Sequence, residues 1–328
     1  MNPLVDTFGR VVRDLRVSVT DRCNFRCTYC MPEEGMVWQD RQDLLTFEEI
    51  ARVVGVFTSR FGVNGVRLTG GEPTVRAHLP LLVERLSGLD TRPELAMTTN
   101  GATLALVAED LRAAGLDRLN ISCDSLRRDR FAEMTRRDAL PAVLEGIEAA
   151  KAAGFDSVKV NCVLIRGVND DEILDFARFG RDHGVGVRFI EFMPLDADGQ
   201  WNAQSVVPST EVLQRIAAPF PIEAATHGPE PAARYRYLDG VGDVGVIASV
   251  TQPFCASCDR VRITADGQFR TCLFAMEETD LRAILRDGGT DDDLEAAIRP
   301  AVAAKWAGHQ IGQVTFTRPR RSMSQIGG

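Results

Sequence analysis

Three cysteines near the N-terminus have the spacing needed to hold a metal cluster. Cys23, Cys27 and Cys30 form a C-x3-C-x2-C pattern within TDRCNFRCTYCMP. Cysteine thiolates are the usual ligands of iron–sulfur clusters, and three of them would occupy three corners of a four-iron cube. The fourth iron would then be open to a small molecule. A structural zinc site would instead need four ligands.

A second group of three cysteines lies near the other end of the chain. Cys255, Cys258 and Cys272 follow a C-x2-C-x13-C pattern, which is again one ligand short of a closed zinc site. His309 is the nearest candidate for a fourth zinc ligand. Three cysteines would again leave one iron of a four-iron cluster without a protein ligand, so the pattern predicts a second cluster with an open iron. A zinc site remains the competing interpretation.

Two further motifs are suited to binding a charged small molecule. The run GGEP at 70–73 directly follows the strand-like run VRLT. Glycines there allow a close approach of the backbone to a ligand, and Glu72 offers a carboxylate to an ammonium group. Arg260 and Arg262 stand at alternate positions after the second cysteine pair, on one face of a strand. Such a pair suits a phosphate group or a purine edge.

The composition predicts a globular protein of about two domains, which we divide into residues 1–194 and 195–328. The chain has 328 residues, 45% apolar and 26% charged, with a net charge of −8. We find no apolar run long enough to span a membrane and no secretory signal, and we expect a cytoplasmic protein. Eight cysteines in such a chain favour metal ligation over disulfides. The acidic balance argues against nonspecific nucleic-acid binding, so any anion must be met by a local cluster of basic residues.

Strand-like runs alternate with amphipathic segments through the first predicted domain. The predicted strands are 15–20, 65–69, 95–98, 118–122, 157–164 and 187–192. The predicted helices are 46–60, which opens on a capping box, then 79–88, 104–114, 141–153 and 171–183. This alternation predicts a parallel sheet with right-handed crossovers.

The predicted strands carry polar residues where buried parallel strands are normally apolar throughout. Arg16 alternates with Val17, and the same alternation places Arg67, Asn120 and Lys159 opposite apolar neighbours. Side chains alternate faces along a strand, so one face packs under helices and the other is polar and cationic. We therefore expect a curved sheet lining a wet cavity, an incomplete (β/α)6 barrel. The alternative is that the strand boundaries are misplaced.

The remainder of the chain has weaker patterns. Residues 195–235 are expected to wrap or extend the sheet, and 236–275 to form short strands and turns that carry the second cysteine group. Helices are predicted over 281–285 and 294–305. By composition, the end RPRRSMSQIGG is a polar and mobile tail.

Taken together, these motifs resemble those of the radical S-adenosylmethionine (SAM) superfamily, whose marks are the three-cysteine motif and a following GGEP. Seven blocks and a terminal glycine pair narrow the resemblance to the GTP 3′,8-cyclase family, also called molybdenum cofactor biosynthesis protein A. The blocks are CNFRCTYC, RLTGGEP, TTNG, NISCDSL, VKVNCVL, FIEFMP and DRVRIT. The resemblance runs nearly end to end, and no motif residue is missing.

The resemblance implies two [4Fe–4S] clusters and SAM as cofactors. The first cysteine group would hold the cluster that binds SAM, and the second would hold a cluster whose open iron meets the guanine end of GTP. The residues implied to line the SAM pocket are Tyr29, Gly71, Ser122 and Met193. Cleavage of SAM would give a 5′-deoxyadenosyl radical.

The resemblance also implies a lyase that acts on GTP. The radical would take the hydrogen at ribose C3′, and the resulting C3′ radical would add to guanine C8. Reduction with proton transfer would then give 3′,8-cyclo-7,8-dihydro-GTP, in the first step of molybdenum cofactor biosynthesis. The implied GTP contacts are Arg16, Arg67, Thr98, Lys159, Arg260, Val261 and Arg262. The catalytic set is Arg16, Arg260 and Arg262, with Gly327 and Gly328 reaching into the site. Arg188 either joins these cations or forms a salt bridge that faces a helix.

The implied partners are GTP, SAM, a reductant of flavodoxin or ferredoxin type, and cyclic pyranopterin monophosphate synthase as the next pathway enzyme. The resemblance also leaves room for a homodimer.

Two competing interpretations of the function remain: a peptide-modifying radical SAM enzyme with auxiliary clusters, or a non-enzymatic protein whose structure is held together by zinc. Cys123 and Cys162 lack partners at ligand spacing and are predicted to be small buried side chains. Asp124 either faces the cavity or starts the next loop.

Overall fold

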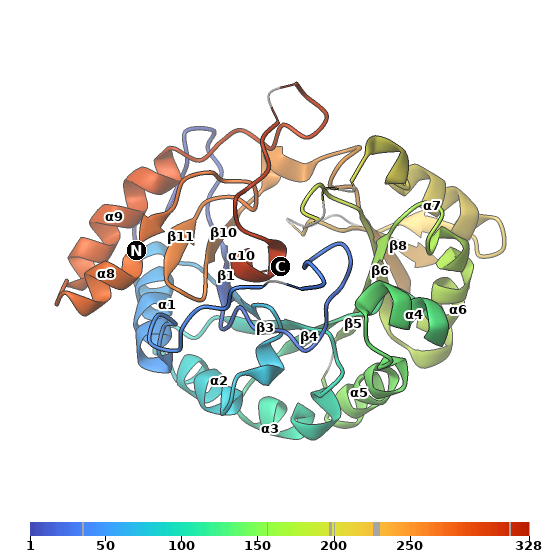
Figure 1. Ribbon diagram of the computed structural model, residues 1–328, viewed down its shortest axis with the longest axis horizontal. Helices are drawn as coiled ribbons and strands as arrows, with labels where there is room; N and C mark the ends of the chain where they lie inside the picture. The colour runs from blue at the N-terminus through green and yellow to red at the C-terminus, as the bar shows by residue number, and fades with distance from the viewer. Residues whose placement is uncertain are drawn as a thin grey trace.

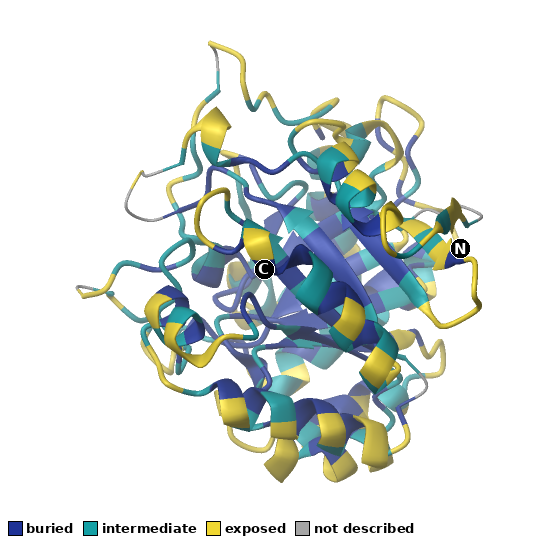
Figure 2. Ribbon diagram, turned by 90° about the vertical axis from the view of Figure 1, so that its right-hand side faces the viewer, coloured by how far each residue is buried: buried dark blue, intermediate teal, exposed yellow. Residues whose placement is uncertain are grey.

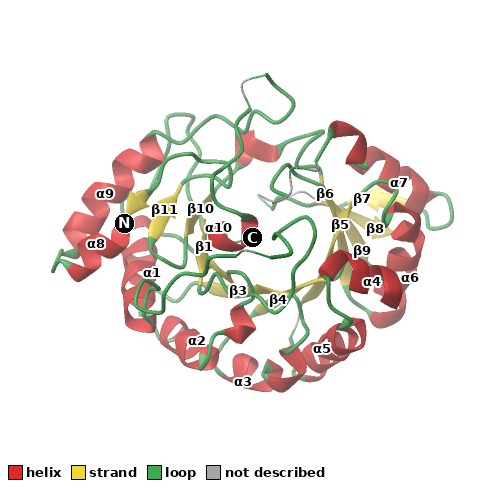
Figure 3. Cartoon of the chain, in the orientation of Figure 1, coloured by secondary structure: helices red, strands yellow, loops and turns green. Residues whose placement is uncertain are grey.

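A ring of helices surrounds a curved sheet in the computed structural model of this chain (Figure 1, Figure 3). The structure describes residues 1–34, 36–155, 157–196, 199, 201–225, 230–314 and 316–327. Buried residues concentrate between the sheet and the helices, while the outward helix faces are exposed (Figure 2). Among the described residues, no helix has the length and apolar character needed to cross a lipid bilayer.

Six parallel strands form the centre of the sheet in chain order. They are β1 (Asp14–Ser18), β2 (Gly65–Thr69), β3 (Glu94–Thr99), β4 (Arg118–Ser122), β5 (Val158–Leu164) and β6 (Gly186–Glu191). Each pairs in parallel with the next strand in the chain. The predicted incomplete (β/α)6 barrel is confirmed, and the predicted strands correspond to these six with small shifts at their ends.

The helices between these strands cover the outer face of the sheet. They are α1 (Phe47–Phe61), α2 (Leu79–Ser87), α3 (Ala108–Ala113), α4 (Arg128–Thr135), α5 (Leu140–Ala152) and α6 (Ile173–His183). The capping box of α1 is present as predicted: the Glu49 N–H donates to Thr46 Oγ1 at 3.1 Å, and the Thr46 N–H donates to Glu49 Oε2 at 2.7 Å.

Two helix predictions in this region need correction. The single helix predicted over 104–114 is wrong, because a 3-10 turn at Leu104–Leu106 precedes α3 and the backbone of Val107 (φ −135°, ψ 0°) is not helical. Helix α4 was not predicted from the sequence. It has few apolar side chains, of which Phe131 and Met134 are buried, so its periodic signal is weak.

The C-terminal part of the chain extends the same sheet at both edges. Strand β10 (Arg260–Ile263) pairs in parallel with β1, and β9 (Asp243–Ile247) pairs in parallel with β6. Short antiparallel strands lie beyond them: β11 (Gln268–Arg270), β12 (Thr279–Asp280), β8 (Ala233–Tyr237) and β7 (Ile222–Ala224). One sheet thus crosses the predicted boundary after residue 194, and the division into two domains stays a prediction.

Helices of the C-terminal part pack on the outside, except for the last one. Helices α7 (Ser209–Ala217), α8 (Leu281–Arg286) and α9 (Asp291–Ala303) are on the outer surface. Helix α9 begins earlier than predicted because Thr290 caps it together with Asp293. The short helix α10 (Met323–Ile326) lies inside the ring (Figure 1). The prediction of a mobile tail is wrong, since Ile326 is 1% exposed.

The core joins the barrel to the C-terminal extension through aromatic contacts. Phe57 on α1 is fully buried, with its ring centroid 5.5 Å from that of Phe61 and 5.8 Å from that of Phe269 on β11. Aromatic packing of this kind contributes to stability beyond the area it buries.

We expect Phe57→Ala to lower the free energy of unfolding by about 3–5 kcal/mol, because it leaves a cavity between two parts of the sheet. Urea unfolding followed by circular dichroism measures the change. The control Leu106→Ala removes a side chain that is 80% exposed and should stay within about 0.5 kcal/mol of the parent. Equal effects of the two substitutions would contradict this description of the core.

Candidate active site

Arginine side chains stand beside one another on the inner face of three neighbouring strands. Arg262 on β10 is in register with Arg16 on β1, and Arg16 is in register with Arg67 on β2. Residues in register on neighbouring parallel strands project to the same face of the sheet. The cationic face that the alternating pattern predicted is therefore present at this side of the barrel.

The polar face continues around the other half of the barrel. Thr98 on β3 is in register with Asn120 on β4, and Asn120 with Lys159 on β5. Arg188 on β6 is 8% exposed, and its charge lowers the pKa of Lys159, so the two cations lie on one face. The carboxylate that pairs with Arg188 is that of Glu230, at 2.7 Å, in the segment before β8 and not on a helix.

Three of these cations, Arg67, Lys159 and Arg262, form no ion pair with a described residue. Arg16 Nε and both Nε and Nη1 of Arg67 are buried without a hydrogen-bond partner. Arg118 differs, because its Nη2 lies 2.5 Å from Glu94 Oε2. The nearest carboxylate to Arg16 is that of Asp14, with 4.0 Å between Nε and Oδ1. Burying like charges together without anions is costly, so this face is suited to an anionic ligand.

The pKa values of these groups reflect burial and the repulsion between neighbouring cations. Burial, followed by the charge of Arg262, holds the pKa of Arg16 well below its usual range. Burial and then Arg260 lower the pKa of Arg262 to about 10. Burial and then Arg188 lower the pKa of Lys159 to about 8. A polyanion bound here would reverse each of these shifts.

The first cysteine group lies in the loop between β1 and α1, directly over the GGEP turn. The N–H of Gly71 donates to the Thr20 carbonyl at 2.7 Å, and that of Glu72 donates to the Arg22 carbonyl at 2.8 Å. A Cβ on Gly70 would lie 2.4 Å from the Thr20 carbonyl oxygen, and one on Gly71 would lie 2.4 Å from that of Arg22. The glycines are therefore needed for close approach to the cysteine loop, a different reason from the ligand contact that we inferred from the sequence.

The three thiols of this loop are suited to ligating a cluster. Burial raises the pKa of Cys23 to about 11 and that of Cys30 to about 12. Burial, followed by the charge of Cys30, holds the pKa of Cys27 well above its usual range. The described residues contain no group of three His, Cys, Asp or Glu side chains placed to bind one ion. A cube offers each thiolate a separate iron, and binding to iron removes the cost of ionising a buried thiol.

Glu72 is buried and its carboxylate is largely used by hydrogen bonds. Oε1 accepts from the Thr74 N–H at 3.0 Å and from the hydroxyls of Thr74 and Thr99 at 2.6 Å each. Oε2 accepts from the Asn100 N–H at 2.6 Å. These bonds tie the end of β2 to the end of β3. One acceptor position on Oε2 is left for the ammonium group that the sequence analysis assigned to Glu72.

Tyr29 connects the cysteine loop to the far side of the barrel. Its hydroxyl donates to Asp124 Oδ2 at 2.7 Å, and its ring stands edge-on to Phe192 at 6.5 Å between centroids. Asp124 is 3% exposed and also accepts from the Val163 N–H at 2.8 Å. It therefore spans the ends of β4 and β5. The other two residues expected at a SAM pocket, Ser122 and Met193, are half-buried at the ends of β4 and β6.

The second cysteine group lies at the start of β10 and after β11. Burial alone would raise the pKa of Cys258, but the charges of Arg260 and Lys305 lower it below that of an ordinary thiol. The pKa of Cys272 is raised by burial, and the neighbouring Cys258 and Cys255 add to this rise. The three thiols thus lie within electrostatic reach of one another, which fits a shared cluster.

His309 is not free to complete a zinc site. Its Nε2 donates to the Ser249 carbonyl at 2.8 Å, and its Nδ1 accepts from the Ile311 N–H at 3.3 Å. Both ring nitrogens are used, so the zinc interpretation loses the fourth ligand that it required. Cys123 and Cys162 are buried as predicted, at 1% and 0% exposure.

The C-terminal tail reaches the inner face between the two cysteine groups. Arg262 Nη1 donates to the Gly327 carbonyl, and the Ser324 N–H hydrogen-bonds the Cys30 thiol. Arg321 anchors the tail through both carboxylate oxygens of Asp266, at 3.0 and 2.9 Å. Gly328 lies outside the described residues.

Comparison with known proteins decides the family. A family model described as the Radical SAM superfamily matches residues 17–180, and one described as Molybdenum Cofactor Synthesis C matches 185–311. A protein of Streptomyces coelicolor named GTP 3′,8-cyclase is 50% identical over 99% of this chain and 96% of its own length. A protein of Mycobacterium tuberculosis named GTP 3′,8-cyclase 2 is 49% identical over 99% and 92%.

The chain belongs to the GTP 3′,8-cyclase family. As a member of the radical SAM superfamily it uses SAM and an iron–sulfur cluster. Streptococcus suis SuiB has the same fold, with a TM-score of 0.61 at 13% identity over 89% of this chain and 69% of its own. AdoMet-bound anSMEcpe has a TM-score of 0.57 at 16% identity over 81% and 77%.

Some residues of the cyclase site were missed in the sequence analysis. Arg118 stands two positions before Asn120 on β4, so the alternating pattern could have placed it on the cationic face. Asp14, with its carboxylate near Arg16, could have been found in the same way. Asn100 and Lys305, which contact cysteines from remote segments, gave no signal.

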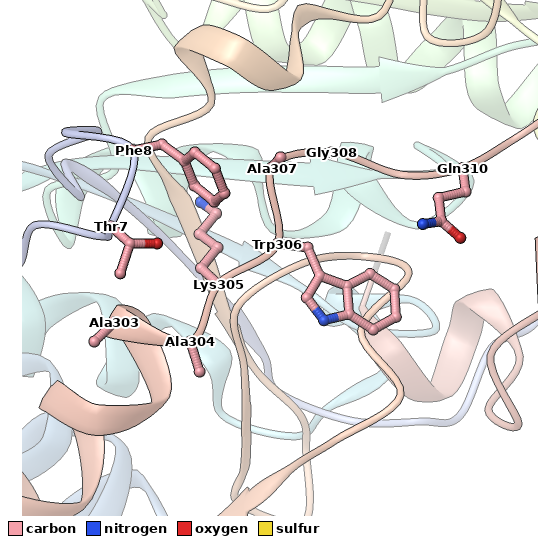
Figure 4. Close-up of a pocket in the computed structure, with 9 residues that line it drawn as sticks. All are labelled: Thr7, Phe8, Ala303, Ala304, Lys305, Trp306, Ala307, Gly308 and Gln310. Atoms are coloured by element: carbon pink, nitrogen blue, oxygen red, sulfur yellow. The ribbon is translucent and has the colours of Figure 1, made fainter.

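A surface hollow lies behind the second cysteine group of the cyclase (Figure 4). It has a volume of about 480 Å³ and lies between Phe8 and the segment 303–308 that follows α9. Gly308 belongs to this segment, and a Cβ there would lie 3.2 Å from Cys255 Sγ. The hollow is therefore separated from the cysteines by one layer of backbone.

We expect Gly71→Ala to lower the iron and acid-labile sulfide bound per chain after anaerobic reconstitution. The added Cβ overlaps two carbonyl oxygens of the cysteine loop, and such overpacking costs about 1–3 kcal/mol. Gly55→Ala is a matched control, because its Cβ would meet only Leu89 Cδ2 at 3.8 Å. Equal iron content in both variants would show that the loop does not depend on the glycine.

Proposed function

We propose that this chain converts GTP into 3′,8-cyclo-7,8-dihydro-GTP, the first step of molybdenum cofactor biosynthesis. The observation that carries the proposal is the buried cationic face between two groups of three cysteines. On this face Arg67, Lys159 and Arg262 form no ion pair with a described residue. Relatives of similar length that are named GTP 3′,8-cyclase support the same reaction.

The first cysteine group and the strand ends around it form the SAM side of the site. Cys23, Cys27 and Cys30 would hold the cluster; Tyr29, Gly71, Glu72, Ser122 and Met193 would surround SAM. When bound, SAM and this cluster supply a 5′-deoxyadenosyl radical that takes the hydrogen at ribose C3′. Tyr29 is hydrogen-bonded to Asp124, and Gly71 to Thr20, so both residues are positioned by contacts within the protein itself.

The inner face of the barrel forms the GTP side of the site. Arg16, Arg67 and Lys159 would neutralise the triphosphate, with Thr98 as a further contact. Arg260, Val261 and Arg262 on β10 would contact the nucleoside, and Cys255, Cys258 and Cys272 would hold a second cluster at the guanine end. Anchoring GTP at both ends fixes C3′ relative to SAM, which supplies the positioning that the reaction needs.

Arg188 and the tail complete the proposed catalytic set. Arg188 is paired with Glu230, so it adds less net charge than the unpaired arginines, and we assign it to the edge of the phosphate site. Gly327 lies against Ser18 and Thr69, and its carbonyl accepts from Arg262. The tail would thereby orient Arg262 toward the substrate, with Gly328 extending further.

We also propose partners outside the site. A reductant of flavodoxin or ferredoxin type would supply electrons, and cyclic pyranopterin monophosphate synthase would receive the product. We propose a cytoplasmic location and retain a homodimer as a proposal. The fold shared with SuiB and anSMEcpe does not favour a peptide substrate, since at 13% and 16% identity it indicates architecture only.

The deciding experiment follows deuterium from GTP labelled at C3′. Anaerobically reconstituted protein is mixed with SAM, a strong reductant and the labelled GTP, and the products are analysed by mass spectrometry. We expect deuterium in 5′-deoxyadenosine together with a cyclised GTP. Unlabelled 5′-deoxyadenosine would point to another substrate or abstraction site. No 5′-deoxyadenosine from protein with both clusters full would contradict the enzyme assignment.

GTP affinity should fall above pH 8 because of Lys159. Its pKa is lowered to about 8 in the free protein, and a bound triphosphate favours the charged form. Binding is therefore strongest below pH 8. Above pH 8, Lys159 must take up a proton from the solvent when GTP binds, and this lowers the observed affinity. Between pH 7 and 9 we expect the Kd to rise about tenfold.

Isothermal titration at pH 7, 8 and 9 measures this dependence. Lys159→Arg is the control, because arginine stays protonated throughout that range and should flatten the profile. A profile that is unchanged by Lys159→Arg would remove Lys159 from the triphosphate site.

Gly327→Ala should lower formation of cyclised GTP by about 100-fold while leaving the fold intact. The residue has φ +85°, and a Cβ would lie 2.7 Å from Thr69 Oγ1 and 2.9 Å from Ser18 Cβ, so the tail must move away. Gly312→Ala is the control: its φ of +83° carries the same backbone strain, but no atom lies within 4 Å of its Cβ. If both variants keep parental activity with unchanged melting temperatures, the tail has no part in the reaction.

A further inference from the structure

A buried lysine behind the second cysteine group has no carboxylate of its own. Lys305 follows α9 and is 4% exposed. Its Nζ donates to the carbonyls of Cys258 at 3.0 Å and Arg260 at 2.8 Å, and lies 3.9 Å from Cys258 Sγ. Within the described part of the chain it forms no ion pair, and Cys258 is the strongest anionic influence on it.

Arg10 is a second buried cation near the same cysteines and can be compared with Lys305. It is 8% exposed and donates to the Cys255 carbonyl at 2.7 Å and the Ala307 carbonyl at 2.8 Å. Unlike Lys305, it carries its own counter-ion, since Nε lies 2.5 Å from Asp6 Oδ2. Arg10 and Asp6 form a balanced pair that fastens the loop. Lys305 has no such contact with a described residue, and Asp6 raises its pKa less than Cys258 does.

An isolated buried ammonium is costly, so an anion is expected near Lys305. The groups directed at Nζ are two neutral carbonyls and a thiol. A cluster held by three thiolates carries negative charge, and reduction adds one more. Net charge and hydrogen bonds to the sulfurs set the reduction potential of such clusters.

We propose that Lys305 is the counter-charge of the second cluster, positioning Cys258 and raising the reduction potential of that cluster. This inference rests on the proposed function, because it requires the second cluster. Lys305 lies in the segment that lines the surface hollow (Figure 4). Gly308 of the same segment lies against Cys255, since a Cβ there would be 3.2 Å from Cys255 Sγ. One segment thus covers two cysteine ligands, and it places its single buried cation against the sulfur of Cys258.

The test isolates the second cluster by combining Cys23→Ala, Cys27→Ala and Cys30→Ala. Each protein is reconstituted anaerobically, and the midpoint potential is measured by electron paramagnetic resonance during redox titration. We expect Lys305→Met to shift the equilibrium at least tenfold toward the oxidised form, which is about 59 mV for a one-electron couple. Lys305→Arg keeps the charge and should stay near the parent. Arg52→Met is the control, because Arg52 contacts Asp291 at the start of α9 and the Gly289 carbonyl in the turn before it.

Three results would overturn the proposal. An unchanged reduction potential in Lys305→Met would contradict the role of Lys305 but would leave the second cluster supported. Failure of the triple-alanine protein to bind iron would remove the second cluster itself, and with it the proposed function at the guanine end. If Lys305→Met does not retain a cluster, the melting temperature of the metal-free protein decides. We expect the metal-free Lys305→Met protein to melt at a temperature at least as high as that of the metal-free parent, because the substitution removes a buried charge without an ion pair. A lower value would show that Lys305 only ties the backbone.

Discussion

The buried positive charge on the inner face of the barrel is the constraint on which the rest of the structure depends. Arg262, Arg16 and Arg67 stand side by side in register, and their burial lowers the pKa of Arg16 and Arg67. A protein gains no stability from such an arrangement by itself. The cost is offset by the apolar core between the sheet and the helices, and it is recovered when an anion binds. The chain as a whole carries a net charge of −8, so this cationic face is a local exception to the acidic balance.

The loops at the strand ends convert this charged face into a site with two sides. The cysteine loop is held against Gly70 and Gly71 by backbone contacts that exclude any side chain. Tyr29 and Asp124 connect it to β4 and β5. The tail closes the other side through Arg262 and Cys30, so residues far apart in sequence meet over the ends of β1 and β2. The positions of the two cysteine groups are therefore fixed by the same strands that carry the cations.

Much of this could be predicted from the sequence, and the exceptions share a cause. Period-two alternation in strands is a local signal, and it revealed both the partial barrel and the residues Arg16, Arg67 and Lys159. The contacts of Lys305 with Cys258, or of Gly327 with Thr69, depend on pairing between distant segments, which one sequence does not encode locally. The same limit explains why composition alone predicts a mobile end where the structure has the buried helix α10. Helix α4 was missed for a different reason, because its few apolar residues give a weak period.

Comparing the binding of GTP and guanosine to the protein reconstituted with SAM tests the central claim most directly. Both ligands offer the same base and ribose, so any difference in affinity reports on the inner cations. We expect isothermal titration to show GTP binding at least 100-fold more tightly, with an affinity that weakens as salt is raised. Equal affinities, or tight GTP binding that does not respond to salt, would mean that the unpaired arginines and Lys159 serve something other than the triphosphate.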